Sequence, residues 1–322
     1  MPCSVRRGRP LAVSLLGCSL ILSGCGLLQP ETQKKSDGPL TLGFVNGGTS
    51  PFHKCLEAAV DDTARNNLAD VHIANSGQDA ANELANIEDM IARGVDAIIV
   101  QTVDVEALRD DIAKAKTADV PVFLTSVVPD DTSDILGAVV VDLEQVGRLD
   151  ADWIEKDAEG EEVQVGIVAG APGAASDLLV GGFESGLPSN AEVVVNEPGM
   201  FDPDKARQVA AEMIRDRPDL DYAFVANEAM AFAVREALDE GGGDAVRIVT
   251  VNGTDEGLAA LKDGRFAATV ANSAADTGEL AVTNTIALLR DWGADRIAHT
   301  PVRLVTADNA DTAPLYCPAN AE

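Results

Sequence analysis

The residues best suited to binding chemistry lie between positions 222 and 257. There, each of two short apolar runs ends on an asparagine, Asn227 or Asn252, just before a helical pattern begins. A carboxamide offers donors and acceptors together, which suits hydroxyl or carbonyl groups of a small molecule. Because open α/β sheets bind ligands at the carboxyl ends of their strands, the two asparagines predict a polar rim at such an edge. Either side chain could instead cap the helix that follows it.

Motifs for catalysis are missing from the sequence. It contains no Gly-x-Ser-x-Gly elbow, no Walker A loop, no Gly-x-Gly-x-x-Gly fingerprint and no His-Glu-x-x-His. The three histidines, His53, His72 and His299, have no metal-ligand spacing. Adjacent carboxylates such as Asp110 and Asp111 point to different sides of a helix, so we expect them to be solvated. We predict no catalytic residue, no metal site and no cofactor, and therefore no enzyme.

The strands and helices that position these asparagines alternate along the chain. From Leu40 onward, apolar strand-length runs alternate with segments that have apolar residues at three- and four-residue spacing. The expected strands are 40–46, 70–74, 97–101, 121–125, 136–141, 163–169, 192–196, 222–226, 246–251, 266–271 and 302–306. The expected helices are 52–68, 79–93, 104–117, 143–156, 175–187, 203–216, 228–240, 254–263 and 276–291. This order predicts an α/β fold with parallel sheets covered by helices on both faces.

The number and similarity of these units predict two lobes. About eleven strands are too many for one comfortable doubly wound sheet. Residues 96–108 followed by 120–126 resemble residues 221–234 followed by 246–254, which suggests two similar halves. We expect the chain to cross between the lobes near position 142, and the lobes to close on a ligand about a hinge.

The first 25 residues read as a targeting segment. Three arginines precede an apolar run at 11–22 that is too short to span a bilayer comfortably. The run ends Leu22-Ser23-Gly24-Cys25, which resembles the bacterial lipobox. We predict a signal peptide at 1–24, a lipidated Cys25 with a tether to 39, and an exported protein anchored at the outer face of the cell membrane, periplasmic or extracellular. An ordinary signal peptide with an incidental cysteine is the alternative.

The net charge and the cysteines indicate which partners and which cellular compartment to expect. The formal net charge is −29, and an acidic surface of this kind repels phosphate backbones, so we expect no nucleic-acid partner. Cys55 and Cys317 follow the lipobox cysteine, and an oxidising compartment favours a disulfide between them. The alternative is one buried thiol on a helix and one thiol on a loose tail.

Several collinear blocks carry a family resemblance. They are Ser50-Pro51-Phe52 and residues 77–104, 120–123, 201–206, 225–234 and 251–257. The blocks resemble the ribose-binding type of periplasmic sugar-binding protein, the receptor component of ABC importers, over roughly residues 40–306. The resemblance implies a periplasmic binding protein type I fold, with two Rossmann-like lobes joined by three crossovers. By this resemblance we expect the first lobe at 40–142 plus 273–300 and the second at 143–272 plus 301–309, followed by a tail at 310–322.

The same resemblance implies a set of ligand-binding residues. The family's contact positions fall on Ser50, Phe52, His53, Gln101, Ser126, Phe201, Asn227, Asn252 and Asn272. Where relatives often have an Asp-Arg pair, this sequence has Ser126 followed by Val127, and the position of a second-lobe arginine falls near Leu179. The matched set therefore has no formal charge. Without a guanidinium clamp, a carboxylate or phosphate ligand is disfavoured, and a neutral ligand is expected.

The resemblance implies a solute-binding lipoprotein. It captures a monosaccharide or related polyol between its lobes and, as a monomer, delivers it to the permease of an ABC importer. The alternative is a ligand-sensing co-receptor for a membrane kinase or chemoreceptor that transports nothing. A sugar-responsive repressor of the same fold would need a DNA-binding segment before the first lobe, where this chain has its signal and tether.

Overall fold

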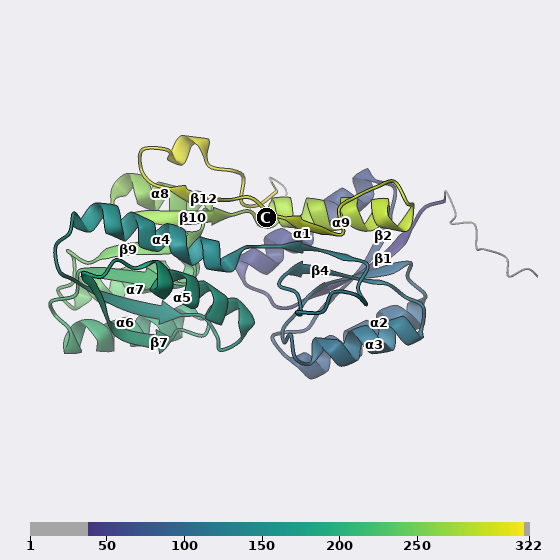
Figure 1. Ribbon diagram of the computed structural model, residues 1–322, viewed down its shortest axis with the longest axis horizontal. Helices are drawn as coiled ribbons and strands as arrows, with labels where there is room; N and C mark the ends of the chain where they lie inside the picture. Colours follow the sequence, from purple (N-terminus) through teal and green to yellow (C-terminus); the bar gives the residue numbers. More distant parts are fainter. Residues whose placement is uncertain (1–37, 319–322) are drawn as a thin grey trace, which may run out of the picture. The chain divides into compact units, whose positions relative to one another are not determined.

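The computed structural model describes residues 38–318, which form two six-stranded sheets (Figure 1). In order across the first sheet, the strands are β11 (Ile297–His299), β5 (Gly137–Val140), β4 (Val122–Ser126), β3 (Ala97–Gln101), β1 (Thr41–Asn46) and β2 (Asp70–Asn75). In the second sheet they are β12 (Val302–Val305), β10 (Ala268–Asn272), β9 (Arg247–Asn252), β8 (Tyr222–Val225), β6 (Val163–Ala169) and β7 (Ala191–Pro198). Neighbouring strands are parallel except β12, which is antiparallel to β10.

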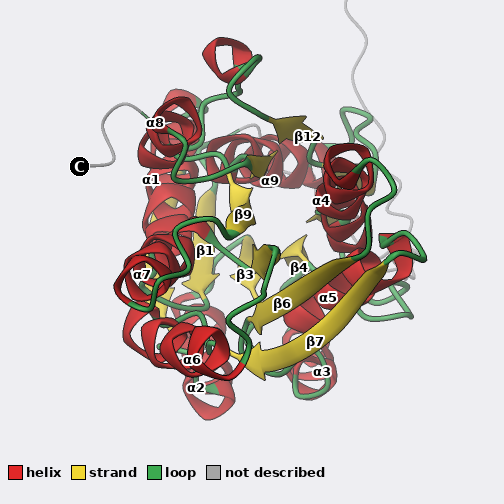
Figure 2. Ribbon diagram, turned by 90° about the vertical axis from the view of Figure 1, so that its left-hand side faces the viewer, coloured by secondary structure: helices red, strands yellow, loops and turns green. Residues whose placement is uncertain are grey.

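Helices cover both faces of each sheet. The first sheet packs with α1 (Pro51–Asn66), α2 (Ala80–Arg93), α3 (Leu108–Thr117) and α9 (Ala274–Leu289). The second packs with α4 (Leu143–Ala158), α5 (Ala174–Gly186), α6 (Pro203–Asp216), α7 (Glu228–Glu240) and α8 (Asp255–Asp263). In Figure 2 the strands of the second sheet lie between α6 and α7 on one side and α4 and α5 on the other. We call each sheet with its helices the first and the second lobe.

Continuous apolar strands follow from this two-sided cover. In β3, Ile99 belongs to the core beneath α1 and α9, whereas Ile98 and Val100 belong to the core beneath α2 and α3. Successive side chains of a strand point to opposite faces, so both sets must be apolar. Each such buried side chain stabilises the fold by about 1.5–3 kcal/mol relative to exposure.

Six of the described helices begin with a side-chain cap. Each capping side chain accepts a hydrogen bond from a backbone N–H three residues further on, which satisfies one of the helix's unpaired donors. The caps are Asp79, Asp142, Asp202, Asn227, Thr254 and Ser273. The helix starts that follow β8, β9 and β10 are therefore each marked locally by a capping residue.

The predicted fold class is confirmed, with three local corrections. Strand β11 was not expected, because Ile-Ala-His is too short to show a period. The expected helix start at 104 is wrong: Asp104 accepts from the amides of Glu106 and Ala107 in a turn, and α3 begins at Leu108. The expectation of a solvated Asp111 is also wrong, since it is 2% exposed, and burial raises its pKa to about 6.

The chain passes between the sheets three times. It does so between β5 and β6, between β10 and α9, and between β11 and β12. The residue boundaries of the lobes given above stay a prediction.

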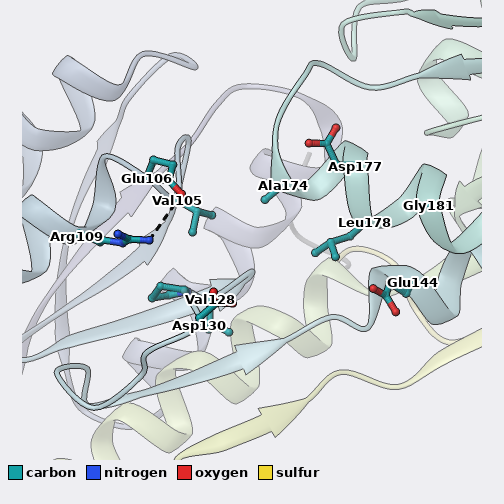
Figure 3. A pocket seen from close by; sticks show the side chains of 11 residues that line it. Val105, Glu106, Arg109, Val128, Asp130, Glu144, Ala174, Asp177, Leu178 and Gly181 are labelled. Carbon is teal, nitrogen blue, oxygen red and sulfur yellow. Dashed lines mark ion pairs between the residues drawn. The ribbon is translucent and has the colours of Figure 1, made fainter.

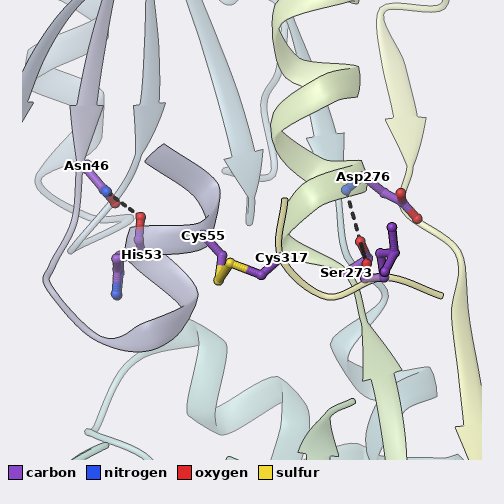
Figure 4. The surroundings of a disulfide bond; sticks show 7 residues. Asn46, His53, Cys55, Ser273, Asp276 and Cys317 are labelled. Carbon is purple, nitrogen blue, oxygen red and sulfur yellow. Dashed lines mark hydrogen bonds between the residues drawn. A yellow bond between two sulfur atoms is a disulfide. The ribbon is translucent and has the colours of Figure 1, made fainter. Parts of the chain in front are cut away.

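The tail after β12 returns to the first lobe. A 3₁₀ turn, η1 (Ala310–Thr312), packs against α8, and Asp311 forms an ion pair with Lys262. Tyr316 then enters the core beneath α1 and α9, and the Ser273 hydroxyl donates to the carbonyl of Leu315 at 2.7 Å. Cys317 is joined to Cys55 of α1 by a disulfide (Figure 4). The tail is thus a further segment that runs from the second lobe to the first.

Candidate ligand-binding site

An oriented amide stands at the carboxyl ends of β3 and β4. The Oε1 atom of Gln101 accepts from the hydroxyls of Thr125 at 2.5 Å and Ser126 at 3.0 Å. Ser126 has φ +69, a left-handed conformation that turns the chain out of β4. With Oε1 engaged twice, the Nε2 group of Gln101 is the end that remains to donate, and no other residue of 38–318 accepts from it.

The loop after β1 packs against this amide. The Ser50 hydroxyl lies 2.7 Å from Nδ1 of His53, and the Asn46 side chain donates to the His53 carbonyl at 2.9 Å (Figure 4). A Cβ atom on Gly47 would lie 2.9 Å from the Gln101 carbonyl and 3.4 Å from Nε2 of His53. Only glycine allows so close an approach. Ser50, His53 and Gln101 therefore belong to one cluster.

His53 is uncharged in this cluster. Burial lowers its pKa from 6.5 to about 4, because an imidazolium loses hydration there without a carboxylate partner. The ring of Phe52 meets the His53 ring edge to face, with centroids 5.7 Å apart, and also packs against the first-lobe core. The cluster offers amide, hydroxyl, imidazole and aromatic groups in neutral form.

In the second lobe, asparagines end β9 and β10 and cap the helix after β8. The Oδ1 atom of Asn227 accepts from the amide of Met230 at 2.8 Å and so caps α7. This is the alternative role that the sequence allowed for this side chain. Asn252 has φ +141, and its Oδ1 accepts from the amide of Glu228 at 3.4 Å. Asn272 is 6% exposed, and its Oδ1 has no hydrogen-bond partner within residues 38–318.

Phe201 follows β7, and its ring packs against Gly170, the residue after β6. A Cβ atom on Gly170 would come within 2.1 Å of its ring, so the absence of a side chain at 170 makes room for the phenyl group. Phe201 has φ +53 and packs partly against the second-lobe core. It follows that each of the four second-lobe residues lies near the carboxyl end of its strand.

The nine predicted residues fall into two groups, one in each lobe. Within the first lobe, contacts join Ser50, Phe52 and His53, while Gln101 and Ser126 are joined by a hydrogen bond. In the second lobe, Asn252 contacts the helix that Asn227 caps. Across the described part of the chain, no hydrogen bond joins one group to the other.

A pocket that the sequence did not predict is lined by residues of both lobes (Figure 3). Its lining is Val105, Glu106, Arg109 and residues 128–130 from the first lobe, with Glu144, Ala174, Asp177, Leu178 and Gly181 from the second. Arg109 pairs with Glu106 at 3.8 Å. Because carboxylates outnumber the one guanidinium, this pocket disfavours an anion. None of the nine predicted residues lines it.

Three further features concern metal binding, membrane-spanning helices and the N-terminal segment. Within residues 38–318, no group of three or more His, Cys, Asp or Glu side chains could hold a metal ion. Nor does that part of the chain contain a helix long and apolar enough to cross a membrane. Cys25, the signal peptide and most of the tether lie outside the described residues.

Comparison with known proteins identifies the family. A model described as "Periplasmic binding protein domain" matches residues 43–294. The ribose import binding protein RbsB of Bacillus subtilis is 26% identical, over 92% of this chain and 99% of its own length. A xylitol-binding protein of Mycolicibacterium smegmatis is 25% identical, over 95% of this chain and 87% of its own.

Solved structures agree. The periplasmic binding protein component of the arabinose ABC transporter from Shewanella sp. ANA-3 has a TM-score of 0.79 and 26% identity, covering 84% of this chain and 93% of its own. A solute-binding protein from Mycobacterium smegmatis has a TM-score of 0.81 at 22% identity, covering 88% and 100%, which shows the fold. With helix-covered parallel sheets and polar strand ends, the chain belongs to the periplasmic binding protein family, in its ribose-type sugar-binding group of solute receptors rather than enzymes.

Proposed function

We propose that this protein captures a small neutral ligand, a monosaccharide or related polyol, between its lobes and delivers it to an ABC importer. The observation that carries the proposal is the Gln101 amide, whose Oε1 is held by two hydroxyls so that its Nε2 is presented as a donor. Such an oriented amide matches a ligand hydroxyl. The neighbouring His53 is neutral at physiological pH and adds no charge.

The second lobe supplies the complementary groups. Asn252 and Asn272 lie on adjacent strands, with Ala271 in register beside Asn252. Each side chain offers an amide to ligand hydroxyls, and Phe201 offers an apolar face to a sugar ring. We assign ligand contact to the nine residues predicted from the sequence, with closure of the lobes bringing the two groups together.

The relatives support this ligand class. Three of those named above are described as proteins that import ribose, bind xylitol or serve an arabinose transporter. All three ligands are neutral polyhydroxylated molecules, which agrees with a site without a guanidinium clamp.

A thermal-shift screen over neutral monosaccharides, polyols and nucleosides tests the proposal. A ligand that binds only the folded protein raises Tm, by an amount equivalent to about 2.7 kcal/mol at a concentration of 100 Kd. We expect at least one neutral sugar or polyol to do so. A protein stabilised only by anionic compounds would contradict the neutral-site assignment.

We also propose that the mature protein is a monomer anchored through a lipid on Cys25. The support is the Leu22-Ser23-Gly24-Cys25 pattern behind an apolar run. Replacement Cys25→Ser is expected to move the protein from the membrane fraction to the soluble fraction, measured by immunoblot, with Cys18→Ser as the control. Membrane retention of Cys25→Ser would argue against this anchor.

A further inference from the structure

We infer that Glu228 is a positioning residue: its buried carboxylate holds the turn at 252–254 in the conformation that presents Asn252. The inference rests on the proposed role of Asn252 in ligand binding. Glu228 is not among the nine residues assigned to ligand contact, although it directly follows one of them, Asn227.

The carboxylate of Glu228 accepts four hydrogen bonds. Oε1 accepts from the amide of Gly253 at 2.9 Å and the hydroxyl of Thr269 at 2.7 Å. Oε2 accepts from the amide of Thr254 at 2.8 Å and from the Thr254 hydroxyl. Glu228 is 1% exposed, so these contacts replace all the water that a carboxylate requires.

The donors come from outside the helix that carries Glu228. A glutamate in the first turn of a helix is ordinarily explained by the helix dipole alone. Here three donors lie in the β9–α8 turn and the fourth on β10, 41 residues along the chain. A Cβ atom on Gly257 would lie 2.2 Å from the carboxylate, so the glycine allows α8 to pack directly over it. The contacts tie three neighbouring elements to one group.

The turn that Glu228 holds has an uncommon backbone. Asn252 has φ +141 and Gly253 has φ +80, and the Asn252 value is rare for a residue with a side chain. Such a conformation persists only where surrounding contacts over-determine it. The backbone amide of Glu228 also donates to Oδ1 of Asn252 at 3.4 Å. The Glu228 carboxylate therefore holds the backbone of the turn at Gly253 and Thr254, while the backbone amide of Glu228 contacts the Asn252 side chain.

The first lobe has a second carboxylate of this kind. Glu83 on α2 is fully buried and accepts from the amide of Val103 at 2.6 Å and the hydroxyl of Thr102 at 2.8 Å. These two residues follow Gln101, the rim amide at the end of β3. Glu83 lies on α2, the helix before β3, and Glu228 lies on α7, the helix before β9. In each lobe, the glutamate holds the turn that follows the next strand.

A double-mutant cycle tests the inference. Glu228→Gln places an NH₂ group against the amides of Gly253 and Thr254, so the hydrogen bonds that hold the turn are lost. Because the turn is then no longer preorganised, affinity for the ligand found in the screen should fall about tenfold. Asn252→Ala should lower affinity between about 5- and 150-fold by removing a ligand hydrogen bond. If Glu228 acts through Asn252, Glu228→Gln has little further effect in the Asn252→Ala background.

Thr269→Val is the matched control. It removes a hydrogen bond to the same carboxylate from the β10 side and leaves the turn held, so Tm should fall while affinity stays within about twofold. Losses from Glu228→Gln and Asn252→Ala that add fully would overturn the positioning role, as would an unchanged affinity in Glu228→Gln. If Glu228→Gln does not fold, Thr254→Val takes its place in the cycle; it removes one hydrogen bond to the Glu228 carboxylate together with the cap of α8.

Hydrogen exchange separates this inference from the proposed function. The amides of Gly253 and Thr254 should lose protection in Glu228→Gln, whether or not a ligand is known. Unchanged protection there overturns the inference alone. A wild-type protein that binds no neutral sugar or polyol overturns the proposed function alone.

Discussion

Replacement Cys317→Ser is expected to lower the free energy of unfolding by about 5 kcal/mol. The disulfide joins positions separated by 262 residues, and in the chain-entropy model a cross-link that closes so long a loop removes much of the freedom of the unfolded chain. The bond also holds the tail, whose Tyr316 is buried in the first-lobe core. Urea unfolding of both proteins under non-reducing conditions measures the difference.

Reduction of the wild type provides the matched comparison. A reducing agent should destabilise the wild type by a similar amount and leave Cys55→Ser/Cys317→Ser unaffected, because that variant has no bond to lose. A loss below about 1 kcal/mol in Cys317→Ser would show that the bond closes a loop already constrained by other contacts.

Stability should also depend on His53 between pH 6.5 and 4. The pKa of His53 falls from 6.5 in the unfolded chain to about 4 in the folded protein, so below pH 6.5 the unfolded state binds a proton that the folded state refuses. The stabilisation is therefore present above pH 6.5 and lost as the pH falls towards 4, by about 3 kcal/mol. Compared with His53→Gln, the wild type should lose that much more stability across this window.

Nuclear magnetic resonance gives the pKa directly. The chain has three histidines, so the His53 ring resonance can be assigned by its loss in His53→Gln. Titration near pH 4 is the expected result. Titration near 6.5 would mean that the site can carry a charge in mildly acidic surroundings, contrary to a neutral rim.

The fold class could be predicted because apolar strand-length runs alternate with segments that have apolar residues at helical spacing. Alternation of β3 side chains between two cores requires the apolar run seen at 97–100, and polar caps mark the helix starts. Local patterns could not show β11, whose three residues pair with β5 from a distant part of the chain. Nor could they show that Asp111 faces the core.

The candidate site could be predicted partly from position in the sheet and partly from the family resemblance. Asn227 and Asn252 were found because they follow apolar strand runs, whereas Gln101 came from the family resemblance; the structure adds which of their atoms are already bonded. Glu228 was missed because a glutamate in a first helical turn needs no special explanation, while its partners lie 25 to 41 residues away. The pocket lined by Arg109 was missed because its residues come from separate segments of both lobes.

The most direct measurement is calorimetric titration of the wild-type protein with matched ligand pairs, each a neutral sugar or polyol and the phosphate ester of the same compound. A rim of amides, hydroxyls and neutral imidazole without a guanidinium predicts that a neutral member binds and its phosphate ester does not. Binding of the esters with no response to the neutral members would contradict the account.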